Sequence, residues 1–133
     1  MMTGRLSSRC RRAVVSGVAL AASALLTVMP LSAHHGWGGY LDNAFEISGT
    51  VSTPVSLAGP HGSLKINANG QVWDVVLAPG ARTAQAGLKE GVIPMGAMVT
   101  VQGHRHRDPK KFEVKTERLT WNGRTFNVYP DRD

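Results

Sequence analysis

Cysteine is nearly absent from this sequence. The single cysteine, Cys10, lies ahead of an apolar stretch near the amino terminus, whereas the cysteine of a lipoprotein would have to follow such a stretch. Cys10 also falls in the segment that we expect to be removed on export. Disulfide bonds and thiol chemistry are therefore excluded from the mature protein.

Close pairs of acidic residues are lacking as well. Glu46, Asp74, Glu113 and Glu117 fall at outward positions of expected strands, and no two of them are spaced for general acid and base catalysis. The sequence also has no Ser/His/Asp arrangement with a nucleophile elbow, no phosphate-binding glycine loop and no paired zinc-ligand spacing. Because no nucleophile can be named, we expect a protein that is not an enzyme.

No hydrophobic run has the length of a typical membrane-spanning helix. The run AVVSGVALAASALLTVM has 17 residues, several of them small, whereas a spanning helix needs ~20 strongly apolar residues. Four arginines precede this run, and Pro30 and the pair Ser32-Ala33 follow it, which is the order of a secretory signal peptide. We therefore expect residues 1–33 to be a cleaved signal, with a membrane anchor as the alternative. The arginine pair in CRRAVVSG also allows twin-arginine export, but the residues after the pair match that signal loosely, so the general secretory route is preferred.

Positive charge is in excess mainly because of the leader. The whole chain has 15 Lys and Arg against nine Asp and Glu, a net charge of +6. Removal of the four leader arginines leaves 11 basic against nine acidic residues, a net charge of +2. A nucleic-acid-binding function, which a strongly basic domain would favour, therefore loses most of its support.

The rest of the chain alternates between apolar and polar residues in short segments, which is typical of an all-β domain. After a glycine-rich arm over residues 34–44, the segment FEISGTVSTPV alternates from Phe45 onward, and Gly49 inside it indicates a bend or bulge. The segment GSLKINANGQVWDVVL predicts a hairpin that turns at Asn69-Gly70. The inward residues of this hairpin would be Leu64, Ile66, Trp73, Val75 and Leu77.

One short helix is expected between the third and fourth strands, around Thr83 to Ala86 and ended by Gly87. Alternation resumes in AMVTVQGHRHR and FEVKTERLTW, before a final turn at Asn122-Gly123. Three strands, a helix and two strands with a final hairpin are the order of the oligonucleotide/oligosaccharide-binding (OB) barrel. We therefore predict an all-β fold, a small five- to six-stranded OB-like barrel over residues 45–133. A small sandwich is the alternative.

The histidines are the most informative residues, and all five follow the expected cleavage site: His34, His35, His61, His104 and His106. Histidine is the commonest metal ligand. If cleavage follows Ala33, His34 offers its α-amino nitrogen and its imidazole to one ion. With a further imidazole, this nitrogen donor set suits copper.

Processing one residue earlier would change the ligands. A chain that starts at Ala33 offers its amine, two deprotonated backbone amides and the His35 imidazole, which form a square-planar clamp for copper or nickel. The alternative to both is a flexible terminal arm whose two histidines are solvated and bind nothing specific.

The other three histidines have plain interpretations as well. His104 and His106 lie two apart in an expected strand, so both side chains should point to the same face. That spacing can seat two imidazoles on one ion, but it also fits a charged strand end that blocks aggregation, which the residues alone favour. His61 lies in the turn AGPHG, where a lone histidine is usually an exposed or capping residue.

The tryptophans are expected to have structural roles first. Trp73 alternates with Val75 and Leu77, which predicts a core position. Trp37 and Tyr40 are expected to pin the glycine-rich arm onto the barrel.

The sequence resembles a family of small exported bacterial proteins of uncharacterised function, in which a signal peptide ends just before or within Ala-His-His. The shared features are AHHGW at 33–37, GTV at 49–51, GPH at 59–61, VWDVVL at 72–77, GLKEGVIPMG at 87–96, VTVQGHRHRDP at 99–109 and NGR at 122–124. The chain departs from the family at Gly59, where Asn is usual, and at residues 36–37. The resemblance covers nearly the whole expected mature domain and implies a small β-barrel with no established activity. It marks His34, His35 and His61 as the polar positions of the pattern, and only this gives His61 weight.

Our first hypothesis is a periplasmic or secreted, non-enzymatic, copper-binding protein. The amine and imidazole of His34 would hold the ion, and His35, His61 or the His104/His106 pair would complete the site.

A second hypothesis, of another class, is a metal-independent periplasmic module. Its open barrel face would hold a protein or a small acidic ligand through Trp37, Tyr40 or Trp121 together with Arg105 and Arg107. A third hypothesis, an oxidative copper enzyme with a terminal histidine, would require redox turnover, for which the sequence offers only that histidine.

Overall fold

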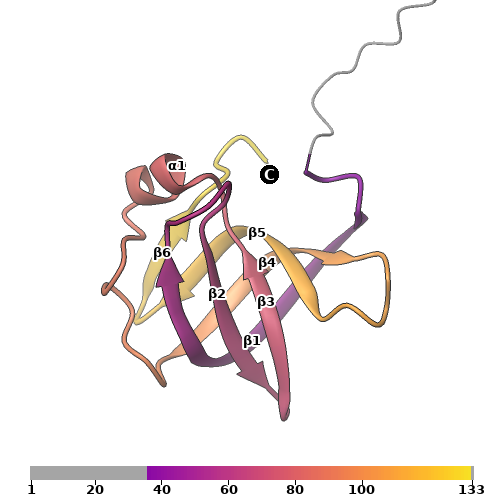
Figure 1. Cartoon of the computed structure of the whole chain (residues 1–133), viewed down its shortest axis with the longest axis horizontal. Coiled ribbons are helices and arrows are strands. Elements are labelled where there is room, and N and C mark those ends of the chain that lie inside the picture. The colour runs from indigo at the N-terminus through magenta and orange to yellow at the C-terminus, as the bar shows by residue number, and fades with distance from the viewer. Residues whose placement is uncertain (1–35, 133) are drawn as a thin grey trace, which may run out of the picture. The chain divides into compact units, whose positions relative to one another are not determined.

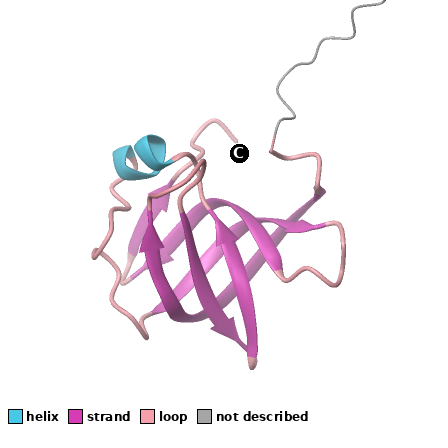
Figure 2. Cartoon of the chain, viewed as in Figure 1, coloured by secondary structure: helices cyan, strands magenta, loops and turns pink. Residues whose placement is uncertain are grey.

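The structure, a computed structural model, describes residues 36–132, which form a barrel of strands with one short helix beside one end (Figures 1 and 2). In chain order the elements are β1 (Tyr40–Ser56), β2 (Ser63–Ala68), β3 (Gln71–Val76), α1 (Gly80–Gln85), β4 (Met98–His106), β5 (Glu113–Trp121) and β6 (Arg124–Asn127). In the described part of the chain, no helix is long and apolar enough to cross a membrane.

The sheet closes into a ring of five strands. Its order is β3-β2-β1-β4-β5-β6, and a further parallel pairing of β3 with β5 joins the two sides. Strand β5 pairs with β3 through its first three residues and with β6 through its last four, so the ring is closed at one end of β5 and extended at the other. The predicted OB-like barrel, with its helix between the third and fourth strands, is confirmed.

Two Asn-Gly pairs make the tight turns of this barrel. Asn69 and Gly70 have φ of 52° and 78°, and Asn122 and Gly123 have φ of 49° and 74°. Positive φ at both central residues defines the turn that matches strand twist, and asparagine and glycine adopt it most readily. Both hairpins therefore form where the sequence predicts them.

Strand β1 starts earlier than the alternation suggests. It begins at Tyr40, five residues before Phe45, because Tyr40 and Ala44 pair with the end of β4. Further along, the Cβ position of Gly49 would lie 2.6 Å from the Asn67 carbonyl oxygen of β2. Only glycine permits this approach of two backbones, at the place where β1 leaves β4 and joins β2.

Helix α1 also starts earlier than expected, at Gly80 rather than near Thr83. The fixed φ of Pro79 precedes it, and the fully buried Thr83 donates its hydroxyl to the Ala78 carbonyl at 2.8 Å. Gly87, with φ of +90°, follows the helix as predicted.

The barrel interior is apolar. Its buried residues are Val51, Val55, Leu64, Ile66, Ala68, Trp73, Val75, Leu77, Leu88, Ile93, Val99, Val101, Val114, Leu119 and Phe126. Trp73 lies in this core, as predicted, and stacks on Phe45 with the ring centroids 5.4 Å apart. The polar side chains of interest therefore lie outside the barrel.

Candidate functional site

A second, partly buried layer lies on the outer face of β4 and β5. Its strand residues are His104, His106, Glu113, Lys115 and Glu117, which we call the strap face. Alternation along each strand directs these side chains away from the core, and His104 and Lys115 are direct neighbours across the two strands. Residues 36–41, which we call the strap, and the carboxyl-terminal residues 129–132 cover this face.

The strap is docked by its aromatic rings, as the sequence predicts. Trp37 packs edge-on against His104 and Tyr129, with centroid distances of 5.6 and 5.1 Å. Tyr40 packs against His106 at 5.4 Å and donates its hydroxyl to Glu113. Burial, followed by the hydrogen bond to that carboxylate, raises the pKa of the Tyr40 hydroxyl.

Lys115 is the residue that sequence reasoning missed. Its alternation in FEVKTER indicates a solvated side chain, yet only 2% of it is exposed. Its Nζ lies 5.6 Å from the centroid of Trp37 and 5.7 Å from that of Tyr129, and no carboxylate among residues 36–132 forms an ion pair with it. Burial lowers the pKa of this ammonium, and the charge of Glu113 opposes that shift in part. The sequence gives one indication of this burial: Trp37 and Tyr129, whose rings cover Lys115, lie near the two ends of the domain.

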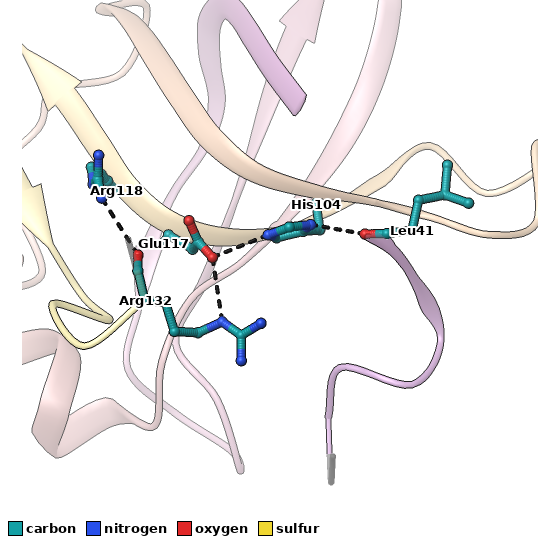
Figure 3. A network of polar contacts seen from close by, with 5 residues as sticks. All are labelled: Leu41, His104, Glu117, Arg118 and Arg132. Atoms are coloured by element: carbon teal, nitrogen blue, oxygen red, sulfur yellow. Dashed lines mark hydrogen bonds and ion pairs between the residues drawn. The ribbon is translucent and has the colours of Figure 1, made fainter. Parts of the chain in front are cut away.

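His104 lies between two hydrogen-bond acceptors (Figure 3). Its Nδ1 is 2.8 Å from the Leu41 carbonyl oxygen, and its Nε2 is 3.1 Å from the Glu117 carboxylate. That carboxylate also accepts from Arg132 Nε at 3.3 Å. Both imidazole nitrogens of His104 are therefore engaged in hydrogen bonds within the fold, whichever of them carries the proton.

His106 is also held by a hydrogen bond. Its Nδ1 accepts the Asp108 backbone N–H at 3.0 Å, so the neutral ring carries its proton on Nε2. A metal at Nε2 would require the proton to move to Nδ1 and break this bond. His104 and His106 do share one face, as predicted, but both rings dock the strap.

His61 differs from these two histidines. It lies in the loop between β1 and β2 and is partly buried, and its ring makes no hydrogen bond within residues 36–132. Burial and then the positive charge of Lys115 lower its pKa, which favours the neutral imidazole with a free lone pair. Of the three described histidines, His61 is the one whose ring nitrogens are not engaged.

The remaining two predicted ligands, His34 and His35, lie outside the described residues. Their covalent neighbour Gly36 lies against Lys115, because its Cβ position would be 3.8 Å from Lys115 Nζ. Among residues 36–132 alone, no group of three or more His, Cys, Asp or Glu could hold a metal ion.

The residues expected to line a ligand-binding barrel face are distributed over different surfaces. The rings of Trp37 and Tyr40 are packed against the strap face. Arg105 points the other way and lies over Trp73, 5.1 Å from the ring centroid, while Trp121 packs partly against the core. A hollow of about 490 Å³ does open between β3 and the segment that leads into β5, lined by Gln71, Val72, Asp74, Lys110, Lys111, Phe112 and Glu113.

Comparisons with known proteins identify no family. No protein-family model matches the sequence, and no curated protein matches it. The apo form of TiaS, a tRNA agmatidine synthetase, is similar over 61% of this chain and 19% of its own, with a TM-score of 0.46 and 18% identity. Its ZRD-deleted mutant in complex with agmatine has a TM-score of 0.46 and 17% identity over 66% of this chain and 27% of that one. A tRNA fluorescent labeling enzyme is similar over 61% of this chain and 19% of its own, with a TM-score of 0.45 and 18% identity. The chain thus spans about a fifth to a quarter of these proteins, and likeness at this level carries no functional argument.

Proposed function

We propose that this protein is an exported, non-enzymatic copper-binding protein whose metal site is built at its mature amino terminus. Cleavage after Ala33 would free the amine of His34, which would bind the ion together with the His34 imidazole. His61 would supply a second imidazole, and His35 would lie beside the site. The periplasm, or the medium, is the compartment that such a signal implies.

The free imidazole of His61 is the observation that carries this proposal. Lys115 is its electrostatic neighbour, and Gly36 lies against the same ammonium. Consecutive Cα atoms are about 3.8 Å apart, so two residues before Gly36 span at most about 7 Å. The proposal therefore links His61 and the amino terminus through Lys115, whose charge acts on His61 and whose ammonium lies against Gly36.

The donor chemistry favours copper. A terminal amine and two imidazoles are neutral nitrogen ligands, and divalent copper binds such sets most strongly among the first-row divalent ions. The expected mature chain has no cysteine, so thiolate sites for zinc or monovalent copper are not available. His104 and His106 are left out of the site because hydrogen bonds within the fold already engage both ring nitrogens of His104 and Nδ1 of His106.

The test is a copper titration of the protein produced with His34 as its first residue. Affinity for Cu²⁺, measured by competition with a chelator, should fall on His61→Ala substitution and on His34→Ala substitution. Exposed Lys111→Ala, which removes no imidazole and no strap contact, serves as the control and should leave affinity unchanged. Equal affinity for wild type and the His34→Ala, His35→Ala double variant would show that the terminal site does not exist.

The start at Ala33 gives a sharper control. That protein has a histidine in third position, which binds Cu²⁺ with its own backbone amides and needs no residue of the barrel. His61→Ala should therefore weaken copper binding in the His34-start protein and have no effect in the Ala33-start protein. A loss of affinity in both would indicate that His61 acts through the fold instead.

One observation favours a second function, metal-independent binding of a small acidic ligand. The 490 Å³ hollow combines exposed Val72 and Phe112, at 44% and 37%, with Lys110 and Lys111. An acidic peptide with an apolar residue would match this lining. Its binding to copper-free protein, followed by amide chemical shifts, should be lost in a Lys110→Ala, Lys111→Ala double variant.

A further inference from the structure

Strand β3 has an open edge along its first half. On one side it pairs with β2 over its whole length. On the other side β5 pairs only with Asp74–Val76, and the Asp74 N–H donates to the Phe112 carbonyl at 2.8 Å just before β5 begins. In the described part of the chain, no strand pairs with this side of residues 71–73. An edge of this kind is a template for a further strand.

Val72 directs its backbone groups to this open edge. Residues two apart on a strand point their N–H and carbonyl groups the same way, so Val72 faces the side on which Asp74 meets Phe112. Its carbonyl oxygen accepts the Gln71 Nε2 amide at 2.9 Å. A side chain of the same strand thus takes the place that the N–H of a partner strand would have, while the Val72 N–H faces the open edge.

The hollow of about 490 Å³ opens at this edge, because its lining comes from β3 and from residues 110–113. Strand β3 forms one wall, and the segment that leads into β5 forms the other. Phe112 is fixed in that second wall, since its ring packs edge-on against Trp73 with the centroids 5.4 Å apart. The Arg105 guanidinium also lies over the ring, 5.9 Å from its centroid. The hollow is therefore bounded by a backbone edge and by an anchored ring.

The free charge in this hollow is positive. Its two acidic residues are already engaged, because Asp74 pairs with Lys65 at 2.7 Å and Glu113 accepts the tyrosine hydroxyl of the strap. Lys110 and Lys111 are exposed, and neither forms an ion pair within residues 36–132. A ligand that complements the hollow electrostatically therefore carries carboxylates.

We propose that the β3 edge binds an extended acidic segment of a partner protein as an added strand. The backbone of this segment exchanges hydrogen bonds with the N–H and carbonyl of Val72. Its carboxylates bind Lys110 and Lys111, and an apolar side chain covers Phe112. Main-chain hydrogen bonds give such a complex its affinity, and side-chain contacts give it specificity. This inference rests on the second proposed function, binding of an acidic ligand, and is independent of copper.

Gln71 has a defined role in this binding mode. Its amide donates to the carbonyl that the added strand requires, so the strand has to displace it. Gln71→Ala removes this competitor and should raise peptide affinity about two- to tenfold, the range that one net hydrogen bond contributes. Exposed Gln85→Ala on α1 is the matched control and should leave affinity unchanged. A loss of affinity in Gln71→Ala would count against strand addition at Val72.

The experiment uses a capped peptide, Glu-Val-Glu-Val-Glu, and follows the amide chemical shifts of the copper-free protein. Two further versions of the peptide carry N-methyl groups, one on both valines and the other on all the glutamates. Only alternate N–H groups of an added strand face the strand that it joins. One methylated peptide should therefore bind like the unmodified one, and the other about tenfold or more weakly. In the complex, hydrogen exchange at the Val72 amide should slow, while exchange in β6 should not change.

Equal effects of the two methylations, with binding of both peptides kept or of both lost, would overturn strand addition. The second function still stands in that case if the unmodified peptide binds and the Lys110→Ala, Lys111→Ala double variant abolishes its binding. If the unmodified peptide does not bind at all, the second function and this inference fail together. The cationic peptide Lys-Val-Lys-Val-Lys is the charge control and should not bind, because the two lysines of the hollow repel it.

Discussion

The two faces of β5 are both covered, but by different means. Inward, Val114 and Leu119 are fully enclosed by other apolar side chains of the barrel. Outward, Lys115 is almost as inaccessible, yet rings, cations and hydrogen-bonded side chains cover it. The inner face is closed by the sheet itself, whereas the outer face is closed by the strap and the carboxyl-terminal segment. Burial on the outer face therefore depends on the strap and on the carboxyl-terminal residues 129–132.

We call the apolar barrel interior the inner layer and the covered strap face the outer layer. The two layers contribute differently to the free energy of folding. Apolar burial contributes about 25 cal/mol per Å² and dominates folding free energy. A cation over a ring contributes only about 0.5–1 kcal/mol at partly exposed sites, and the enclosed ammonium of Lys115 carries a desolvation cost. The outer layer thus adds little stability but holds side chains in defined places, which is what a binding site requires.

Leu119→Ala should have the largest effect on stability. Leu119 is fully buried in the barrel, and truncation of such a leucine costs about 2–5 kcal/mol through lost burial and the cavity left behind. Equilibrium urea unfolding measures this loss. A loss below about 1 kcal/mol, well under that range, would mean that the inner layer is not the main source of stability, and the comparison between the layers would fail.

Trp37→Ala should cost less, about 1–2 kcal/mol, because its ring contacts are cation–π and edge-on pairs at a partly exposed site. The effect should also be local. Hydrogen exchange should accelerate in residues 37–41 and remain slow in β2 and β3. Equal acceleration throughout the barrel would show that the strap is part of the cooperative core and not a separate layer.

The inner layer could be predicted from the sequence because its signals are local. Asn69-Gly70 and Asn122-Gly123 mark turns by their own backbone preferences, and two-residue alternation assigns each strand residue a face. Together these locate the strands and the register of the two hairpins, β2 with β3 and β5 with β6. The OB-like barrel follows from them without knowledge of any distant contact.

The outer layer could not be predicted, because alternation says only that a residue leaves the core. Lys115 has the outward position expected of it, but its cover comes from Trp37 and Tyr129, which are 78 residues before it and 14 residues after it in the chain. Likewise, the spacing of His104 and His106 indicates a shared face and says nothing of the hydrogen bonds that engage their rings. Whether a histidine can bind a metal depends on the groups that surround its ring in the fold. Only the structure therefore distinguishes His61 from His104 and His106.

Lys115→Met tests whether the buried ammonium of Lys115 lowers the stability of the folded protein. Methionine keeps the apolar stem and removes a charge that has no carboxylate partner among residues 36–132. Stability at pH 7 should not fall and should rise by up to about 1 kcal/mol, since the lost desolvation cost exceeds the lost cation–π attraction. Exposed Lys111→Met is the matched control and should be neutral in urea unfolding. A loss above about 1 kcal/mol, the scale of the cation–π attraction itself, would show that the ammonium stabilises the layer.

His61 gives the smallest and most specific effect, a dependence of stability on pH in the copper-free protein. Its pKa in the folded chain is lowered from 6.5 by burial and by the charge of Lys115. Below pH 6.5 the unfolded chain gains a proton that the folded chain resists, so stability should fall as the pH drops from 6.5 to the lowered pKa.

This part of the pH dependence should disappear in His61→Asn and leave stability at pH 7.5 unchanged. Lys115→Met should reduce it without abolishing it, because burial of the imidazole remains while the neighbouring positive charge is gone. The double variant should then match His61→Asn, since Lys115 acts on this slope only through the imidazole. Independent, additive effects of the two substitutions on the slope would mean that His61 and Lys115 do not share a site, and the route from Gly36 to His61 would lose its common neighbour.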